Sequence, residues 1–424
     1  MFVIRALLIS LFVCLGGHSA FADQLFGIVS ERNSATAAAA AKQFADRYPN
    51  AEISLRTPRQ LGQMSDVEIT DRIARSDVFF VAGVFSEDAN RLGRLIENPG
   101  KTEDLYIVSS TRNLISLSRD RSGVGIDLDE SLEDALATTN ASWTLANNYW
   151  QARGVDNLSN LFAALLNQDK LDQIPPPAPI APVRFADIVG PPSAPIIGIV
   201  DYDTGDQAGN SDLHDRLCAE LVSHGAACLS VYADWGAASA DALEQLGSRN
   251  VSGTILLQDF AIGGSEQDRA QDALIQLDTP LLKGIRLVDL EEADWRSGSD
   301  GMPTDSVYYR VAMPELVGAS QPLILATAAP PRLDPISGIE IRVTQPIDDE
   351  VASAVKRMIA WTDLQTVSNQ DKRLAIIYYN HPPGRHNIGA DNLDVAASLF
   401  QILKRLDRDG YDVGTLPESP EALL

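Results

Sequence analysis

Short apolar runs alternate with helix-forming segments along most of this chain, and this alternation restricts the fold more than any other feature. In the first part of the chain, runs at 24–30, 51–55, 78–85 and 105–110 read as strands, and segments at 35–48, 66–75 and 129–170 read as helices. Strands that alternate with helices are typical of a parallel sheet covered by helices on both faces. We therefore expect an α/β chain of tandem doubly wound units, Rossmann-like or flavodoxin-like.

The same alternation resumes after residue 195. Strands are predicted at 196–201, 228–232, 253–258, 280–290, 306–313, 338–344 and 374–379, with another beginning at 411–413, and helices at 212–224, 240–246, 349–364 and 393–408. In the helix at 212–224, Leu213, Leu217 and Leu221 share one face, and Gly225 suits a helix end.

A proline-rich stretch separates the two regions. Residues 175–195 contain eight prolines, and such a stretch favours an extended, stiff linker. The predicted organisation is a signal peptide at 1–22, an α/β domain at 23–173, a linker at 174–195, a second α/β domain at 196–370, and the start of a further βα unit at 371–424.

The N-terminus has the pattern of a cleavable secretory signal. Arg5 supplies a positive charge, residues 6–15 form an apolar run, and Ala20-Phe21-Ala22 fits a cleavage site before Asp23. The run is short for a bilayer span, which needs about 20 apolar residues. We expect an exported protein without a stable membrane span, periplasmic if the source is Gram-negative.

Net charge narrows the range of partners. Lys and Arg number 34 against 58 Asp and Glu, which gives a formal charge of −24. Because such a surface repels phosphate backbones and anionic lipid, nucleic acid is not an expected partner.

Two cysteines, Cys218 and Cys228, remain after signal cleavage. In an oxidising compartment they can form a disulfide, and two small buried thiols are the alternative. With His214 and His224 they could also form a metal site, although their spacing matches no zinc motif and the leucines of the helix define its core face.

Acidic residues follow the predicted strand at 196–201. Asp201, Asp203 and Asp206 suit a ligand-binding loop, but their order does not fit a calcium loop. The sequence contains no phosphate-binding loop of the G-x-x-x-x-G-K-[ST] type, no G-x-S-x-G motif, and no G-x-G-x-x-G after a strand. These absences disfavour nucleotide hydrolysis by that loop, serine-hydrolase chemistry and dinucleotide binding.

The last segment carries the most specific pattern. A loop at 380–392, NHPPGRHNIGADN, lies between a predicted strand and a predicted helix. Its histidines and carboxylates, His381, His386, Asp391 and Asp394, suit metal delivery, and Arg385 suits an anion. The alternative is that the prolines and glycines shape the loop, Asp394 caps the helix and the histidines are exposed.

This segment resembles the large subunit of cobaltochelatase (CobN) and the H subunit of magnesium chelatase. The matching residues are Asn380, Pro382, Pro383, Gly384, Asn387, Ile388 and Gly389 in the loop, then Leu393, Asp394, Val395, Ser398, Leu399, Gly410, Tyr411 and Val413. Residues 196–232, 293–302 and 311–316 also resemble that family, so the resemblance covers most of 195–424.

The resemblance implies a protein that binds a tetrapyrrole and inserts a divalent metal, cobalt or magnesium, as in cobalamin or chlorophyll biosynthesis. It also implies partner subunits of a chelatase that perform ATP-driven work. The ligand-binding candidates are Asn380, His381, Arg385, His386, Asn387 and Asp394, and no catalytic residue or resident metal ligand is assigned. The alternative function is an exported tetrapyrrole- or metal-binding protein of the same fold without catalysis.

Overall fold

The computed structural model describes residues 24–97, 104–120, 123–126, 141–202, 211–379 and 393–423. The predicted signal peptide and the whole 380–392 loop lie outside these ranges. Among the described residues, one compact unit contains those up to Ile180 together with Pro330–Val343, and a second unit contains the others. Each unit has its own sheet and its own core.

The first unit is built on a four-stranded parallel sheet of order β2-β1-β3-β4. Its strands are β1 (Gln24–Val29), β2 (Glu52–Arg56), β3 (Val78–Val84) and β4 (Asp104–Ser110). Its helices are α1 (Ser34–Arg47), α2 (Pro58–Gln63), α3 (Asp66–Arg75), α4 (Ser86–Ile96), α5 (Arg112–Ile115), α7 (Ala141–Ala152) and α8 (Gly154–Leu166), with 3-10 turns η1 (Glu31–Asn33) and η2 (Gln168–Gln173).

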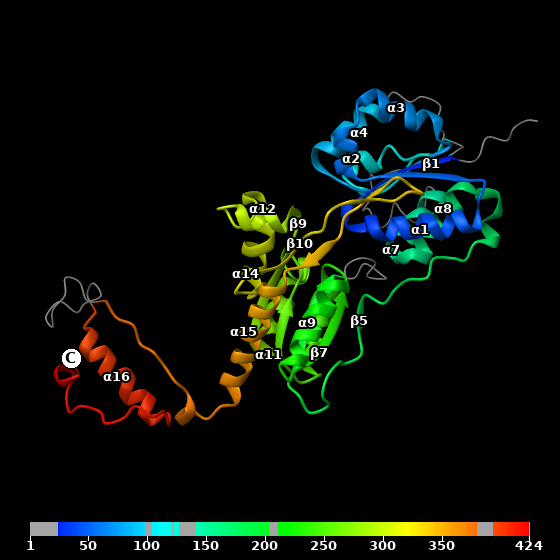
Figure 1. Ribbon diagram of the computed structural model, residues 1–424. Helices are drawn as coiled ribbons and strands as arrows, with labels where there is room; N and C mark the ends of the chain where they lie inside the picture. The colour runs from blue at the N-terminus through cyan, green and yellow to red at the C-terminus, as the bar shows by residue number, and fades with distance from the viewer. Residues whose placement is uncertain are drawn as a thin grey trace, which may run out of the picture. The chain divides into compact units, whose positions relative to one another are not determined.

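Helices cover both faces of this sheet. Figure 1 shows α2, α3 and α4 on one face and α1, α7 and α8 on the other. The arrangement follows from the apolar sequence VFFVAGV of β3, which is buried almost throughout and needs cover on both sides. The alanines of α1 allow it to pack closely against α8, where Phe44 meets the edge of Phe162 at 6.5 Å between ring centroids.

A late segment of the chain completes the first unit. Residues 330–343, here called the clasp, contain the short paired strands β11 (Arg332–Leu333) and β12 (Glu340–Ile341). The backbone N–H of Leu55 donates to the Ser337 carbonyl at 2.9 Å, and Ile339 is fully buried in the core of the first unit.

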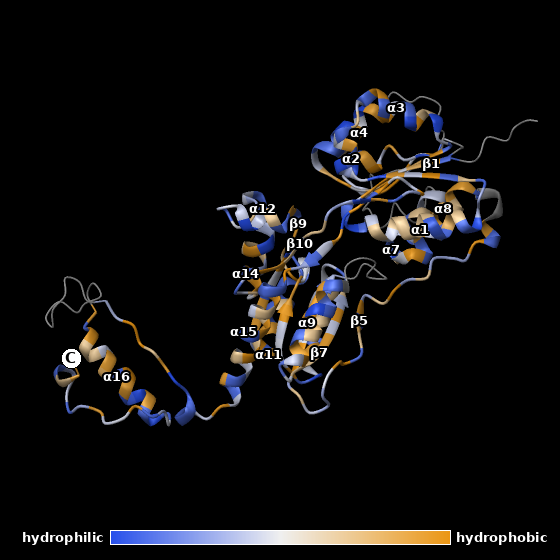
Figure 2. Cartoon of the chain, viewed as in Figure 1, coloured by the Kyte–Doolittle hydropathy of each residue, from blue (hydrophilic) through white to orange (hydrophobic). Residues whose placement is uncertain are grey.

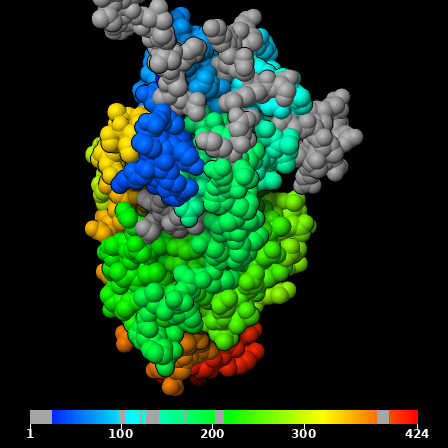
Figure 3. Space-filling view, turned by 90° about the vertical axis from the view of Figure 1, so that its right-hand side faces the viewer, coloured from blue at the N-terminus to red at the C-terminus, as the bar shows by residue number. Residues whose placement is uncertain are grey.

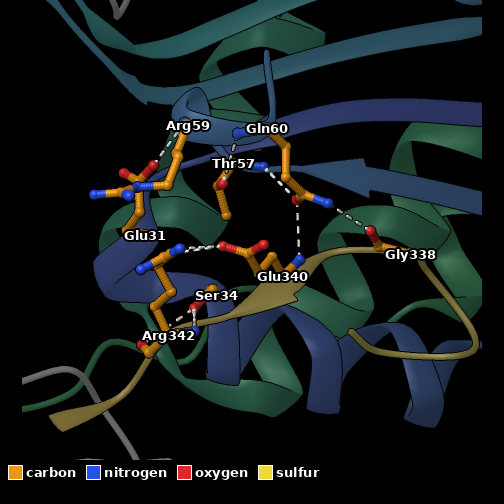
Figure 4. Close-up of polar contacts among 8 residues, drawn as sticks. All are labelled: Glu31, Ser34, Thr57, Arg59, Gln60, Gly338, Glu340 and Arg342. Carbon is orange, nitrogen blue, oxygen red and sulfur yellow. Dashed lines mark hydrogen bonds and ion pairs between the residues drawn. The ribbon is translucent and has the colours of Figure 1, made fainter. Parts of the chain in front are cut away.

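Polar contacts hold the clasp, as Figure 4 shows. The Gln60 side-chain amide donates to the Gly338 carbonyl at 3.0 Å, and its oxygen accepts from the Glu340 N–H at 2.9 Å. The Arg342 N–H donates to the Ser34 hydroxyl at 2.9 Å. The sequence predicted a strand at 338–344 within the second domain, whereas burial of the Ile339 side chain places most of that stretch in the first unit.

The second unit is built on a seven-stranded sheet of order β13-β10-β9-β8-β6-β7-β5. Its strands are β5 (Val183–Phe185), β6 (Ile196–Tyr202), β7 (Ala227–Ala233), β8 (Val251–Leu256), β9 (Leu281–Glu291), β10 (Leu323–Ala328) and β13 (Thr344–Pro346). The five inner strands are parallel, and the edge strands β13 and β5 are antiparallel to their neighbours. The expected mixed α/β fold with parallel sheets is therefore confirmed.

Helices also cover both faces of the second sheet. The helices of this unit are α9 (Ser211–Ser223), α10 (Ala237–Gly247), α11 (Gln267–Leu277), α12 (Glu292–Ser297), α13 (Thr304–Val307), α14 (Met313–Val317), α15 (Asp348–Thr366) and α16 (Val395–Arg408), with the π-helical segment η4 (Tyr308–Ala312) and the 3-10 turns η3 (Gly264–Glu266), η5 (Asn369–Asp371) and η6 (Pro420–Ala422). Of these, α16 packs with η6. Ile197 and Ile199 of β6 pack in the core with α9 and α15, and Val200 packs in the core with α10 and α11. Figure 2 shows apolar strands between helices whose outer faces are hydrophilic.

The end of α9 follows the sequence prediction. Leu213, Leu217 and Leu221 are buried, and Gly225 adopts a φ of +80°, which favours glycine. The Ala226 N–H donates to the Leu221 carbonyl at 3.0 Å, which closes the helix end.

Three predicted strands are wrong. Residues 306–313 are helical, because the chain enters a helix directly after Pro303. Residues 374–379 form no strand and Ile377 is 95% exposed, since among the described residues no neighbouring strand pairs with them. Residues 411–413 are likewise not in a sheet.

The proline-rich stretch is mostly exposed, and Figure 3 shows the blue-green linker region at the surface. One part of it does more than the expected extended, stiff linker, because Val183–Phe185 pairs with β7 as an edge strand. Edge positions tolerate flanking prolines, which cannot donate a backbone hydrogen bond. Within the described ranges, no helix is both long enough and apolar enough to cross a membrane.

Candidate functional site

Charged side chains, most of them buried, gather near the carboxyl ends of β6 and β8 and along the neighbouring strand β9 of the second unit. In parallel α/β sheets, ligands bind beyond the carboxyl ends of the strands. The members of this cluster are Asp201, His214, Asp259, Lys283, Arg286, Asp289 and Arg310. We call this set the charge cluster.

Asp201, near the end of β6, forms one half of the charge cluster. Its carboxylate lies 2.5 Å from Nη2 of Arg286 on β9 and 3.0 Å from Nε2 of His214 on α9. Burial alone would raise the pKa of Asp201, but the Arg286 guanidinium and the His214 hydrogen bond outweigh it and hold that pKa well below its ordinary value. The side chain is therefore a buried carboxylate with a matched cation.

His214 links Asp201 to Ser230 on β7. Its Nδ1 lies 3.1 Å from the Ser230 hydroxyl, so an aspartate, a histidine and a serine form one hydrogen-bonded chain. Serine hydrolases use the same aspartate–histidine–serine arrangement to activate the serine as a nucleophile. Here, however, Ser230 lies inside β7, which is paired on one side with β6 and on the other with β5. Its neighbouring N–H groups serve the sheet, so the chain of contacts has a structural role.

Lys283, on β9, belongs to the other half. It is fully buried, and its ammonium donates to the Asp259 carboxylate at 3.0 Å and to the Gly284 carbonyl at 2.6 Å. Burial lowers the pKa of Lys283, and the Asp259 carboxylate opposes that effect.

Arg310, from η4, completes that half. It is 3% exposed, and its Nε lies 3.7 Å from the Asp259 carboxylate while its Nη2 donates to the Asp289 carboxylate at 3.3 Å. Asp289 is half exposed and marks the solvent side of the cluster.

The cysteines lie beside this cluster. Cys218 of α9 and Cys228 of β7 are joined by a disulfide, so they cannot both serve as thiolate ligands of a metal. A cleft of about 570 Å³ next to the bond is lined in part by His214, Ser230 and Tyr232. In the part of the chain that the structure describes, no group of three or more histidine, cysteine or acidic residues could hold a metal ion.

The loop candidates divide between described and undescribed residues. Asn380, His381, Arg385, His386 and Asn387 lie outside the described residues, as do Asp203 and Asp206. Asp394 is the N-cap of α16, and its carboxylate accepts a hydrogen bond from the Ala397 N–H at 2.9 Å. That contact agrees with the capping alternative for this residue.

Sequence reasoning named Asp201 and His214 but did not pair them, and it missed Lys283, Arg286 and Arg310. A signal was available, because Lys283 and Arg286 interrupt the apolar strand sequence LLKGIRLV. Charged residues are rarely fully buried unless they are paired, so two cations in such a strand predict buried partners.

Comparison with known proteins identifies the family. The family described as CobN/Magnesium Chelatase matches residues 147–424, which is well over half of the chain. The chain belongs to this family. The match covers the whole charge cluster and the loop at 380–392.

Individual members of the family are similar in sequence to this chain. The chain is 30% identical over 243 residues to the magnesium-chelatase subunit ChlH of Oryza sativa subsp. indica, which covers 55% of this chain and 17% of the relative. It is 33% identical over 162 residues to the H subunit of magnesium chelatase from Chlorobaculum parvum, covering 38% of this chain and 12% of the relative. It is 25% identical over 239 residues to the aerobic cobaltochelatase subunit CobN of a Sinorhizobium species, covering 54% of this chain and 18% of the relative.

A solved structure supports the fold. The catalytic subunit of cobaltochelatase from Mycobacterium tuberculosis matches with a TM-score of 0.58 and 21% identity, over 93% of this chain and 32% of that one. The chain therefore spans less than a third of the length of these chelatase subunits.

Proposed function

We propose that this protein takes part in inserting a divalent metal, cobalt or magnesium, into a tetrapyrrole. The observation that carries the proposal is the family match over residues 147–424. Relatives named as magnesium-chelatase and cobaltochelatase subunits support it. The metal is a substrate of this reaction, and the tetrapyrrole is the molecule that receives it.

Metal insertion needs two kinds of residue. A base must accept the protons of two pyrrole N–H groups, and weak ligands must hold the metal until it enters the ring. His381 and His386 suit both tasks, and Asn380, Arg385 and Asn387 suit contacts with the macrocycle or its acidic side chains. In this proposal the half of the charge cluster that contains Arg310 contacts the tetrapyrrole, and the 380–392 loop acts on it.

The proposal includes export and partners. Residues 1–22 act as a cleaved signal peptide, and the mature protein begins at Asp23 in the periplasm. The Cys218–Cys228 disulfide supports this location, because cytosolic thiols are kept reduced. Partner subunits of a chelatase would supply the energy for insertion.

A second candidate function rests on the same disulfide and signal sequence. An exported chain is separated from cytosolic ATP, so it could capture a tetrapyrrole or a metal without catalysis. Binding without metal insertion distinguishes this candidate from the first.

The test uses residues 23–424 with the disulfide formed. Free-base deuteroporphyrin is titrated in while its Soret band is followed, and Mg²⁺ or Co²⁺ is then added with and without chelatase partner subunits. A shifted Soret band that saturates at micromolar concentration, followed by the spectrum of the metallated ring, supports metal insertion. Binding without metallation supports the second candidate, and no spectral change contradicts metal insertion and tetrapyrrole capture alike.

Variants at the loop test the division of tasks. Replacing His381 and His386 together with alanine should leave deuteroporphyrin binding unchanged and abolish metallation. Arg269→Gln is the matched control, because Arg269 is an exposed side chain on α11 that pairs only with Asp241, Glu244 and Glu266 in the described structure. Unchanged metallation in the double variant would overturn the role of the histidines.

A further inference from the structure

Arg310 has hydrogen-bonding capacity that the described protein does not use. Its side chain is 3% exposed, yet within the described ranges neither Nε nor Nη1 has a hydrogen-bond partner. A buried guanidinium with unmade hydrogen bonds is costly, and native structures seldom retain one without a reason.

The carboxylates beside Arg310 hold it loosely. Asp259 lies 3.7 Å from Nε, and Asp289 lies 3.3 Å from Nη2, whereas Asp201 lies 2.5 Å from Arg286 in the same cluster. Asp259 is also engaged by Lys283 at 3.0 Å. Arg310 can therefore donate to a further carboxylate without losing a short ion pair.

A stacked aromatic pair lies beside this guanidinium. The rings of Phe260 and Tyr309 stack with centroids 5.0 Å apart and an interplanar angle of 19°, and the Arg310 guanidinium carbon lies 5.1 Å from the Tyr309 centroid. Phe260 is 45% exposed, although it follows β8 in a left-handed conformation with a φ of +63°. That conformation is strained for a non-glycine residue, and the Phe260 N–H is fixed to the Tyr309 carbonyl at 2.6 Å.

We propose that Arg310 binds an acidic side chain of the tetrapyrrole while the Phe260–Tyr309 pair contacts the edge of its ring. The proposal rests on the proposed function, because it names where that substrate is recognised. A guanidinium binds a carboxylate through two parallel hydrogen bonds, and an aromatic pair with the Phe260 ring exposed suits a flat conjugated ligand. Carboxylate recognition and ring contact thus come from neighbouring residues at the carboxyl end of the sheet.

The test compares deuteroporphyrin with its dimethyl ester, which has the same ring but no carboxylate. Both are titrated against residues 23–424 in the same detergent. The wild-type protein should bind the free acid about tenfold or more tightly than the ester, since hydrogen bonds to charged groups contribute roughly that factor. Arg310→Gln should remove this preference and leave ester binding unchanged.

Two more variants keep the test valid if Arg310→Gln folds poorly. Arg310→Lys retains the charge but not the paired hydrogen bonds, so the preference for the acid should fall while the fold is kept. Phe260→Ala should weaken binding of acid and ester by a similar factor, because the Phe260 ring contributes a ring contact and no hydrogen bond to a carboxylate. Arg269→Gln should change neither.

The outcomes separate this inference from the proposed function. Equal binding of acid and ester by the wild-type protein would overturn carboxylate recognition and leave tetrapyrrole binding intact. A preference that persists in both Arg310 variants would assign it to another residue and overturn the inference as well. If neither ligand binds, the inference and the proposed function both fail.

Discussion

At the scale of single residues, Asp201 joins two other polar side chains of the second unit. It is buried and holds both Arg286 and His214. Asp201→Asn would leave the Arg286 guanidinium in the interior without its carboxylate. Removing one partner of a buried pair costs about 3–5 kcal/mol, and urea unfolding at neutral pH measures that loss in the free energy of unfolding. Arg269→Gln, an exposed control, should cause a much smaller change, and equal losses would contradict this account.

The same residue gives a pH dependence. Because the pKa of Asp201 is lowered in the folded protein, its contribution is fully present above the unfolded pKa of about 3.9. That contribution is lost as the pH falls from there toward the folded pKa. Urea unfolding at decreasing pH should therefore show the stability gap between wild type and Asp201→Asn narrowing below about pH 4. A gap that is constant down to acid-induced unfolding would contradict the pairing.

The residues that make up the candidate site could be predicted from the sequence only in part. Asp201 is a candidate from sequence because it follows an apolar strand, and Asp394 fits the sequence position of a helix cap. Arg310 could not be placed, since the pattern of its segment indicates a strand although the segment is helical. Its partners Asp259 and Asp289 come from other elements, so only the fold brings them together.

At the scale of elements, the disulfide ties α9 to β7. Cys218 and Cys228 are 10 residues apart in sequence, and closing a loop of that length stabilises a protein by about 2–3 kcal/mol in the chain-entropy description. We expect Cys218→Ala/Cys228→Ala to lower the unfolding free energy by that amount in urea. Added reductant should destabilise the wild type and leave the double variant unaffected, and equal sensitivity of both would argue against the bond.

The position of the clasp in the first unit could not be predicted from sequence patterns. Its residues follow β10 in the chain, yet they complete the core of the first unit. Ile339→Ala should destabilise the first unit by about 2–5 kcal/mol, because it removes a fully buried side chain. Limited proteolysis of the clasp should be faster in this variant. The exposed Ile336→Ala serves as control, and equal proteolysis of the two variants would contradict a core role for Ile339.

At the scale of the whole molecule, the architecture was the most predictable level. Parallel sheets need apolar strands and intervening helices, and both leave clear periodic signals. The strand order and the return of residues 330–343 to the first unit depend on long-range packing, which those signals do not contain. The family resemblance came from the loop at 380–392 and adjoining segments, and the family match over 147–424 confirms it.

We propose that this family member binds a tetrapyrrole after export. A native mass spectrum of a periplasmic extract, taken from cells that produce all 424 residues and supplied with free-base deuteroporphyrin, tests it most directly. We predict one species with the mass of residues 23–424, less two hydrogens for the disulfide, plus one porphyrin. Two results would contradict the account. One is a periplasmic protein with the mass of residues 23–424 and no bound porphyrin, and the other is a chain found only in the cytosol with residues 1–22 attached.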